Sequence, residues 1–248
     1  MMEPTADEGN EDDMEIAGSV ALVTGANRGL GASLCASLLE RGAAKVYAGA
    51  RDPSSVTMAG VEPIRLDITS SADIEAAVRQ CGDVTLLVNN AGIGTGTGAL
   101  AEDAAEKAQQ EFDTNVLGPL AMCRAFAPIL GANGGGAIVN VLSVLAWWSA
   151  PRSALYCAAK AASLSLTNSI RLELHAQHTQ VLALHVGFMD TDMTAGLDVP
   201  KSSPDDVAAQ VIDGLEAGAH EVLADDASRH VRAGLSGDLT ALYPALAS

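Results

Sequence analysis

The chain has 248 residues, 48% of them hydrophobic and only 3% aromatic, and its formal net charge is −17. This length allows a sizeable core, which alanine, valine and leucine must fill because aromatic residues are scarce. The acidic balance argues against nucleic acid and anionic membranes as partners, since phosphate groups bind to basic surfaces.

Residues 1–17 carry seven acidic side chains and little to bury, which predicts a disordered acidic tail before a single domain over residues 18–248. No apolar stretch is expected to span a bilayer, and the start of the chain lacks the pattern of a signal peptide, so we expect a cytoplasmic protein. The histidines show no ligand spacing, and no metal is expected. The cysteines form no CxxC pair, which indicates reduced thiols; they are Cys35, Cys81, Cys123 and Cys157.

From Gly18 onward, apolar runs alternate with helical patterns. The runs are continuous and helices separate them, which is typical of a mostly parallel sheet covered on both faces. We therefore expect an α/β fold, a doubly wound (Rossmann) three-layer αβα sandwich with seven strands. The expected strands are 19–23, 45–48, 61–66, 84–88, 137–142, 181–186 and 221–223. The expected helices are 30–41, 73–80, 101–130 (bent or interrupted near Gly118-Pro119), 153–177 and 204–217.

A glycine-rich turn, Thr-Gly-Ala-Asn-Arg-Gly-Leu-Gly at residues 24–31, joins the first strand to the first helix. Glycines in this position allow a tight turn and a close approach to a pyrophosphate, which rests on the positive end of the helix. In this context the pattern predicts a dinucleotide site. The candidate ligands are Gly25, Asn27, Arg28, Gly29, Leu30 and Gly31.

The end of the second strand indicates which nicotinamide cofactor binds. A carboxylate there receives the ribose 2′-hydroxyl of NAD, whereas an arginine receives the 2′-phosphate of NADP. Here Arg51 follows Ala50, and Arg28 adds a second cation. Asp52 comes one position late for the ribose, and Asp67 is better placed for the adenine amine. The pattern favours NADP(H).

Tyr156 and Lys160 are four residues apart, so both lie on one face of the expected helix. A free phenol has a pKa near 10, too high for proton exchange at neutral pH. An ammonium about 4 Å away contributes roughly 4 kcal/mol at an effective dielectric of about 20, so we expect Lys160 to lower the pKa of Tyr156. Ser143 ends the fifth strand, thirteen positions earlier, and its hydroxyl can hold a substrate oxygen.

In order and spacing these residues resemble the short-chain dehydrogenase/reductase family, over about residues 18–224. The resemblance is carried by the glycine turn, by Asn-Asn-Ala-Gly at residues 89–92, by Asn115, and by Ser143, Tyr156 and Lys160. It implies an oxidoreductase in which Tyr156 is the general acid/base and Asn115, in an irregular helical turn, binds a water leading to Lys160. The implied contacts to the cofactor include Asp67, Ile68, Asn89, Ala91, Gly92, Tyr156, Lys160, Gly187 and Thr191. Val186 departs from the proline that the family usually has there.

The substrate is expected to be a hydrophobic ketone or aldehyde, because apolar residues follow the fifth and sixth strands. The expected pocket is Leu145, Trp147, Trp148, Phe188, Met189 and Met193, with Ile93, Thr95 and Thr97 as the opposite wall. The alternative for the tryptophans is packing against a neighbouring loop or subunit. The resemblance implies a homodimer or homotetramer whose subunits contact each other through helices 101–130 and 153–177. Two other functions stay open: a non-redox enzyme of a biosynthetic pathway with this fold, and an NADP(H)-sensing regulator.

Overall fold

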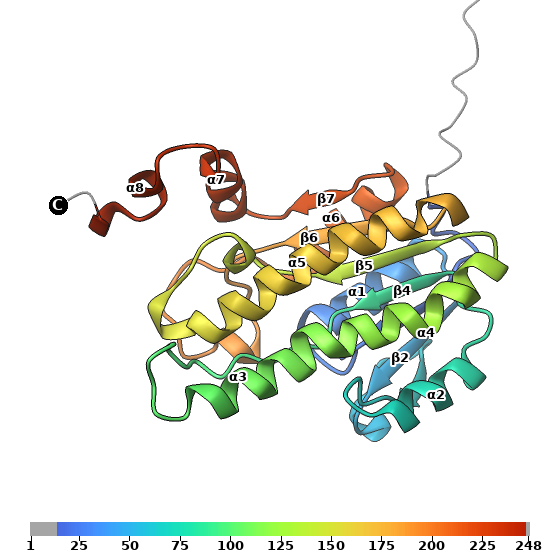
Figure 1. Ribbon diagram of the computed structural model, residues 1–248. Coiled ribbons are helices and arrows are strands. Elements are labelled where there is room, and N and C mark those ends of the chain that lie inside the picture. The colour runs from blue at the N-terminus through green and yellow to red at the C-terminus, as the bar shows by residue number, and fades with distance from the viewer. Residues whose placement is uncertain (1–13, 247–248) are drawn as a thin grey trace, which may run out of the picture.

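The computed structural model describes residues 14–246 and shows one sheet of seven parallel strands with helices on both faces (Figure 1). The strand order is β3-β2-β1-β4-β5-β6-β7, which reverses direction between β1 and β4. This order confirms the predicted doubly wound fold. The strands are β1 (Val20–Thr24), β2 (Lys45–Ala50), β3 (Glu62–Arg65), β4 (Leu86–Asn89), β5 (Ala137–Val141), β6 (Gln180–His185) and β7 (Glu221–Leu223).

The helices cover the sheet in two layers that bury different core clusters. On β1, Ala21 and Val23 face the cluster under α1 and α6, and Leu22 faces the cluster under α2 and α4. Because both faces are buried, each strand reads as a continuous apolar run. The helices are α1 (Gly29–Glu40), α2 (Ser71–Gln80), α3 (Ala104–Phe112), α4 (Gly118–Ala132), α5 (Ala154–Leu174), α6 (Pro204–Glu216), α7 (Asp226–Gly234) and α8 (Leu239–Leu242).

The long helix expected over 101–130 is interrupted by one turn of π-helix, Asp113–Leu117, between α3 and α4. The interruption lies just before the predicted Gly118-Pro119. Gly118 has no room for a side chain, because a Cβ there would lie 2.7 Å from Cδ1 of Ile68. Together with the π turn, α3 and α4 form one helix, Ala104–Ala132, which is long and apolar enough to cross a membrane by length and composition alone. The expectation that no apolar stretch could span a bilayer missed this helix. That evidence is weak, because a helix that packs on a sheet passes the same test.

Both ends of the described chain add features that the hydrophobic pattern does not reveal. Residues 1–13 lie outside the described residues, and the disordered tail stays a prediction for them. Met14 and Ile16 are buried against the core, ahead of the boundary expected at Gly18. After β7, the short helices α7 and α8 project beyond the body of the sandwich (Figure 1).

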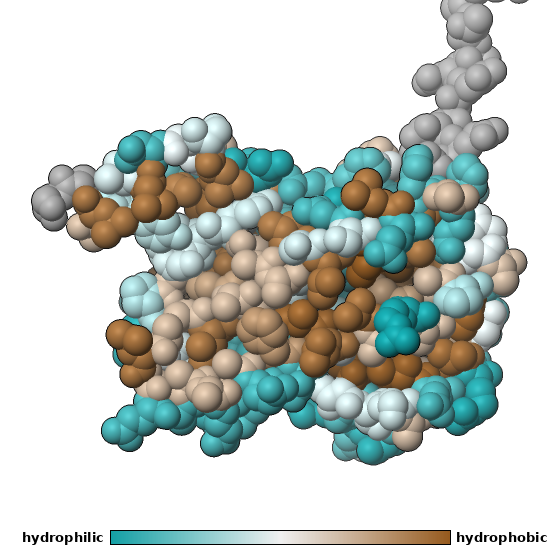
Figure 2. Space-filling view, in the orientation of Figure 1, coloured by the Kyte–Doolittle hydropathy of each residue, from teal (hydrophilic) through white to brown (hydrophobic). Residues whose placement is uncertain are grey.

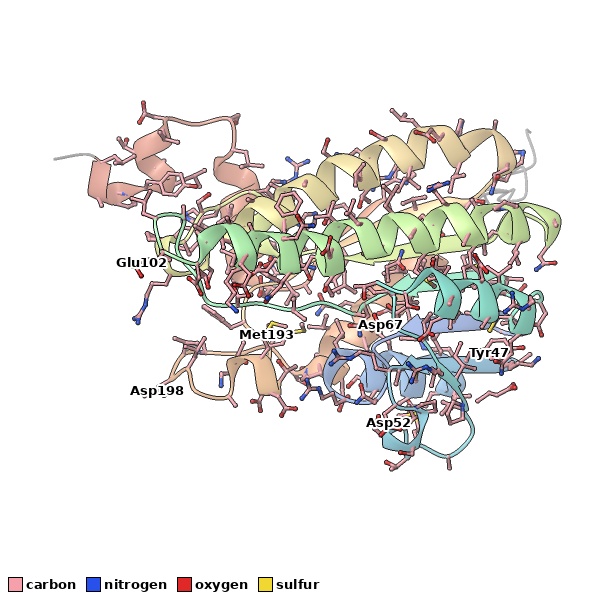
Figure 3. All side chains as sticks on the ribbon, turned by 60° about the horizontal axis from the view of Figure 1, so that its bottom comes forward. Tyr47, Asp52, Asp67, Glu102, Met193 and Asp198 are labelled. Atoms are coloured by element: carbon pink, nitrogen blue, oxygen red, sulfur yellow. The ribbon has the colours of Figure 1, made fainter. Side chains whose placement is uncertain are left out.

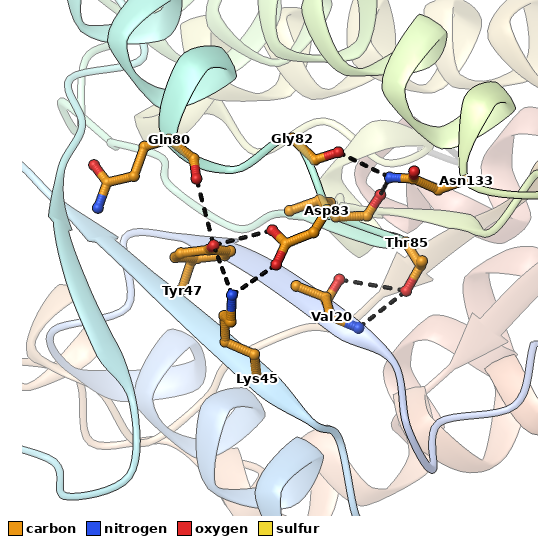
Figure 4. Close-up of polar contacts among 9 residues, drawn as sticks. Val20, Lys45, Tyr47, Gln80, Gly82, Asp83, Thr85 and Asn133 are labelled. Atoms are coloured by element: carbon orange, nitrogen blue, oxygen red, sulfur yellow. Dashed lines mark hydrogen bonds and ion pairs between the residues drawn. The ribbon is translucent and has the colours of Figure 1, made fainter.

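A polar cluster closes the sheet at the amino ends of its strands (Figure 4). Lys45 Nζ donates to Asp83 Oδ2 at 2.6 Å, and the Tyr47 hydroxyl donates to Asp83 Oδ1 at 2.9 Å. Asn133 Nδ2 donates to the carbonyls of Gly82 and Val84. These bonds tie the turns at this end to one another, while the opposite end, at the carboxyl ends of the strands, is where doubly wound folds bind ligands.

Candidate active site

The glycine turn at residues 25–31 is a backbone cradle in which each glycine has its own steric reason. Gly25 and Gly29 have φ angles of +65° and +52°, which L side chains rarely adopt. A Cβ at Gly31 would lie 2.2 Å from the carbonyl oxygen of Gly25. Helix α1 begins immediately after Arg28, whose side chain makes no capping bond. The first amides of α1, including those of Gly29, Leu30 and Gly31, are thus available to a pyrophosphate.

Thr24 and Asn90 hold this turn against the end of β4. The Thr24 hydroxyl accepts hydrogen bonds from the amides of Asn90 (2.9 Å) and Ala91 (3.0 Å). The Asn90 side chain donates to the carbonyls of Thr24 (2.9 Å) and Gly25 (3.1 Å). The Asn-Asn-Ala-Gly motif marked this segment, but the bracing role of Asn90 depends on strand pairing that the sequence does not display.

Asn89, expected among the cofactor ligands, uses its side chain in the core. Its Nδ2 donates to Asn140 Oδ1 at 2.9 Å and to Cys123 Sγ at 3.3 Å, and the residue is buried. A strand-end residue has an even chance of facing inward, and this one faces the layer of α4. The Asn89 side chain therefore joins β4 to β5 and does not face the glycine turn.

The end of β2 presents the cation that the sequence indicated, and a second one beside it. Arg51 is exposed, and the Arg65 guanidinium donates from Nη1 to the Arg51 carbonyl at 3.1 Å. Asp52 caps the short 3-10 helix Pro53–Ser55, and the hydrogen bonds from Ser54 lower the pKa of its carboxyl group. Asp52 is thus engaged locally, and Arg65, which ends β3, is a candidate for the 2′ position that sequence reasoning missed.

Asp67 and Ile68 follow β3 at the expected adenine end of the site. Asp67 Oδ1 accepts hydrogen bonds from the Thr69 amide (2.9 Å) and hydroxyl (2.7 Å), which lower the pKa of the Asp67 carboxyl group. Ile68 is buried against Gly118, so its side chain serves packing. Figure 3 labels Asp52, which follows β2, and Asp67, which follows the neighbouring strand β3.

The catalytic candidates meet at Gly92, just beyond β4. A Cβ placed on Gly92 would lie 3.0 Å from Asn115 Oδ1 and 3.9 Å from Lys160 Nζ. Lys160 Nζ donates to the Val141 carbonyl at 2.8 Å and lies 5.5 Å from the centroid of the Tyr156 ring. The structure thus brings together Asn115 from the π turn, the tyrosine–lysine pair from the start of α5, and the end of β5.

The expected effect of Lys160 on the pKa of Tyr156 is not what the structure gives. Burial raises the pKa of the Tyr156 phenol, and the nearby Glu111 and Cys157 raise it further. Burial also lowers the pKa of Lys160 to about 8, which Glu111 partly opposes. The prediction from the sequence treats Tyr156 and Lys160 as a solvated pair about 4 Å apart. In this site desolvation is the larger effect, and it disfavours the charged form of both groups.

Asn115 holds the loop after β4 with its side chain. Its Oδ1 accepts from the Ile93 amide and its Nδ2 donates to the Ile93 carbonyl, both at 2.9 Å. The Asn115 carbonyl, expected to face a water, accepts a hydrogen bond from the Ser163 hydroxyl at 2.7 Å. The expected irregular turn is present, and a cavity of about 20 Å³ borders both Asn115 and Lys160, enough for one water.

Ser143 lies between the loops that follow β5 and β6. Its hydroxyl accepts from the Leu145 amide at 3.1 Å and donates to the Val186 carbonyl at 3.3 Å. Val186, which replaces the family's proline, is buried in the core. The Gly187 amide donates to Asp225 Oδ2 at 2.6 Å, and sequence reasoning missed Asp225 because it is 38 residues further along the chain.

The two tryptophans follow the alternative that the sequence left open. Trp147 stacks on His185, with ring centroids 3.6 Å apart. Trp148 donates from Nε1 to the Leu242 carbonyl at 3.0 Å and stacks on Tyr243. Both rings therefore pack against other segments of this chain, Trp147 against β6 and Trp148 against the end of α8, and they do not form an open pocket wall.

The loop after β6 supplies the apolar residues nearest to Tyr156. A Cβ at Gly94 would lie 3.7 Å from Tyr156 Cδ2 and 3.8 Å from Met193 Sδ, so both side chains border the space at Gly94. Phe188 is about half exposed, and Met189 packs against the core. The Thr191 methyl group would lie 3.2 Å from a Cβ at Gly29, which places it beside the glycine turn.

Within residues 14–246, no group of three histidine, cysteine or acidic side chains gathers to hold a metal ion. The four cysteines are free and buried.

Comparisons with known proteins agree with this geometry. A short-chain dehydrogenase from Burkholderia cenocepacia, solved in complex with NADP, is 40% identical, with a TM-score of 0.90 over 95% of this chain and 100% of that chain. A family member from Burkholderia phymatum in complex with NAD is 26% identical, with a TM-score of 0.78 over 90% of this chain and 95% of that one. The 3-oxoacyl-(acyl-carrier-protein) reductase of Vibrio harveyi is 31% identical over 214 residues, which are 83% of this chain and 85% of the relative.

The family model described as short chain dehydrogenase matches residues 19–201, which contain the glycine turn, Asn115, Ser143, Tyr156 and Lys160. The chain belongs to the short-chain dehydrogenase family of oxidoreductases.

Proposed function

We propose that the protein transfers a hydride between NADP(H) and the carbonyl or alcohol carbon of a small, apolar ketone, aldehyde or alcohol. The observation that carries the proposal is the convergence of Asn115 and Lys160 at Gly92, with the Tyr156 ring beside Lys160, one strand end away from the glycine turn. The residues of that turn would hold the pyrophosphate of a dinucleotide, and its nicotinamide would supply the hydride to a substrate at this group.

The residues present fit NADP(H). The cradle at Gly25, Gly29 and Gly31 leaves no room for side chains and presents helix amides to a pyrophosphate. Arg51 and Arg65 offer guanidinium groups at the end of β2 and β3, where a 2′-phosphate requires them, and Asp52 is engaged in its own cap. When bound, the reduced cofactor supplies a hydride to the carbonyl carbon.

The proton chemistry falls to Ser143 and Tyr156. In reduction, the Ser143 hydroxyl holds the substrate oxygen, and the Tyr156 phenol donates the proton that this oxygen needs as it becomes a hydroxyl. The raised pKa of Tyr156 keeps the phenol protonated at neutral pH and makes it a weak acid, so the proton moves as hydride transfer makes the substrate oxygen strongly basic. Lys160 and the cavity beside Asn115 are placed to return a proton to the tyrosinate.

The substrate is apolar in this proposal because the exposed Met193 lies next to Tyr156 at Gly94. We also propose self-association through α4 and α5. Apolar residues gather over these two helices on the face seen in Figure 2. On α5, Leu172 has an exposed fraction of 79%. A large apolar area on a surface is typical of an interface with another chain.

The test is Tyr156→Phe, assayed by NADPH absorbance with a panel of ketones and aldehydes. We expect a fall in turnover of about 10²- to 10⁴-fold, the usual contribution of a general acid, with NADPH affinity nearly unchanged. Tyr47→Phe, the same change at the opposite end of the sheet, is the matched control and should keep full activity.

Retained turnover in Tyr156→Phe would contradict the mechanism. Tight NADPH binding without oxidation by any substrate of the panel would instead favour the two other functions, a non-redox enzyme or an NADP(H)-sensing regulator.

A further inference from the structure

Glu111 on α3 is the one acidic side chain in the described part of the molecule that is completely buried. Its Oε1 accepts hydrogen bonds from the Thr95 amide (2.7 Å) and the Thr95 hydroxyl (2.6 Å). Its Oε2 is buried and has no partner among residues 14–246. A carboxyl group with an unpaired oxygen is costly to bury, so such a group calls for a functional explanation.

The position of Glu111 connects it to the catalytic group. It lies four residues before Asn115, so both side chains extend from one face of the α3–π segment. Asn115 holds Ile93, and Glu111 holds Thr95. Between these two anchors is Gly94, the residue against which Tyr156 and Met193 pack. Glu111 therefore fixes the segment of chain that covers the Tyr156 ring.

We infer that Glu111 is a positioning residue of this active site, which fixes the Thr95 loop over Tyr156 and places a buried negative charge beside the tyrosine–lysine pair so that the site favours carbonyl reduction. The inference rests on the proposed function. It adds a group that neither the glycine turn nor the catalytic set includes.

The charged and titratable groups around Glu111 give the direction of its effect. On α5 these are Tyr156, Cys157 and Lys160, whose protonated forms Glu111 favours. The loop between β4 and α3, which contains Thr95, carries Glu102 and Asp103 at its far end, and both are exposed. On its own helix, Glu106 and Lys107 are paired with each other at 4.0 Å. A protonated phenol is the form that donates in reduction, and a protonated Lys160 keeps its bonds to acceptors. The first effect favours reduction over oxidation, and the second keeps the Lys160 ammonium in place in both directions.

Glu111→Gln separates the charge from the hydrogen bonds, because the amide oxygen can still accept from Thr95. In carbonyl reduction with NADPH, activity is lost as the pH rises through the pKa of Tyr156. We expect this alkaline limb to move about one pH unit lower in Glu111→Gln, since the removed charge no longer favours the phenol. Glu106→Gln, which removes an exposed charge from the same helix, should leave the limb in place.

Thr95→Val tests the other half of the inference. It keeps the charge and the amide bond but loses the hydroxyl bond, so we expect the pH profile to stay fixed while the KM for the carbonyl substrate rises about fivefold. Equal pH limbs in wild type and Glu111→Gln would overturn the inference. Should Glu111→Gln fail to fold, Glu111→Asp keeps a charge there and must keep the wild-type limb, and a shifted limb in that variant would overturn it.

A readout without turnover separates this inference from the proposed function. Protein labelled with ¹³C on the tyrosine rings and saturated with NADP⁺ gives a signal for Tyr156, assigned as the one absent in Tyr156→Phe. This signal should titrate at lower pH in Glu111→Gln than in wild type. If the two titrations coincide, Glu111 does not act on Tyr156. If Tyr156→Phe keeps its activity while the titrations differ, the proposed mechanism fails and the charge effect stands.

Discussion

The two halves of the sheet position their ligands by different means. In the half built from β1 to β4, the backbone itself forms the proposed cofactor site: Gly25, Gly29 and Gly31 shape the turn, and Asn90 braces it from the next strand end. In the half built from β5 to β7, side chains from distant segments fix the loops. The Asp225 carboxylate accepts a hydrogen bond from the Gly187 amide, and the Leu242 carbonyl accepts one from the Trp148 indole.

The difference follows from what each half must bind. A dinucleotide has one shape, so its site tolerates little change and depends on short, local stretches of chain. A substrate pocket varies between relatives, and loops held by replaceable side chains permit that variation. We therefore expect substitutions that add bulk in the first half to abolish function. Substitutions in the second half should change function gradually.

The largest effect is expected for Gly31→Ala. Its Cβ would lie 2.2 Å from the Gly25 carbonyl oxygen and 2.6 Å from Asn90 Nδ2, so the turn must open. We expect loss of detectable NADPH binding by fluorescence titration and a loss of about 1–3 kcal/mol in the free energy of unfolding, as for other overpacked sites. Gly82→Ala is the control, because a Cβ there meets nothing within 4 Å. Normal NADPH affinity in Gly31→Ala would show that the turn is not a rigid cradle.

Arg51→Asp is the next largest. It removes a guanidinium expected to receive the 2′-phosphate and introduces a carboxylate that suits a ribose hydroxyl. A charge-assisted hydrogen bond contributes about 1.5–3 kcal/mol, so the ratio of kcat/KM for NADPH to that for NADH should fall by about 10- to 100-fold. Arg79→Asp, at the end of α2, controls for the change in net charge. An unchanged ratio would move the 2′-phosphate contact to Arg65 or Arg28.

His185 offers a measure of how firmly the second half is packed. It is fully buried, stacks on Trp147, and bonds through Nδ1 to the Ser143 carbonyl at 3.2 Å. Burial lowers the pKa of His185 to about 4. The unfolded chain therefore takes up a proton near pH 6.5 that the folded chain does not accept until about pH 4, so stability is lost as the pH falls through this window.

Between pH 7.5 and pH 5 this histidine should cost about 2 kcal/mol of unfolding free energy, measured by urea denaturation. His185→Phe keeps an aromatic ring against Trp147 and should remove that part of the pH dependence. His230→Phe, at an exposed position, should leave it unchanged. If wild type and His185→Phe lose stability equally on acidification, burial next to Ser143 does not keep the His185 imidazole neutral.

The same contrast explains what could be predicted from the sequence. The fold and the glycine turn were accessible because they depend on local patterns, namely apolar runs, helix starts and three glycines. Glu111, Arg65 and Asp225 were not, because each acts on a residue that only the fold brings near. The direction of the Tyr156 pKa shift was predicted wrongly for a related reason. Spacing gives the distance between two charges, whereas burial, which decides the pKa here, is a property of the packed structure.

The smallest effect is expected at an exposed ion pair between the two halves, that of Arg28 in the glycine turn with Asp192 in the loop after β6, at 2.6 Å. Both side chains are largely exposed, and such pairs contribute at most about 1 kcal/mol. Asp192→Asn should free Arg28 for a 2′-phosphate and tighten NADPH binding about two- to threefold at low salt, with the gain disappearing at high salt because salt screens exposed charges. Asp190→Asn, two residues earlier in the same loop, should have no such effect. Weaker NADPH binding in Asp192→Asn would mean that the pair instead holds this loop over the cofactor, and that the second half assists the binding of the first.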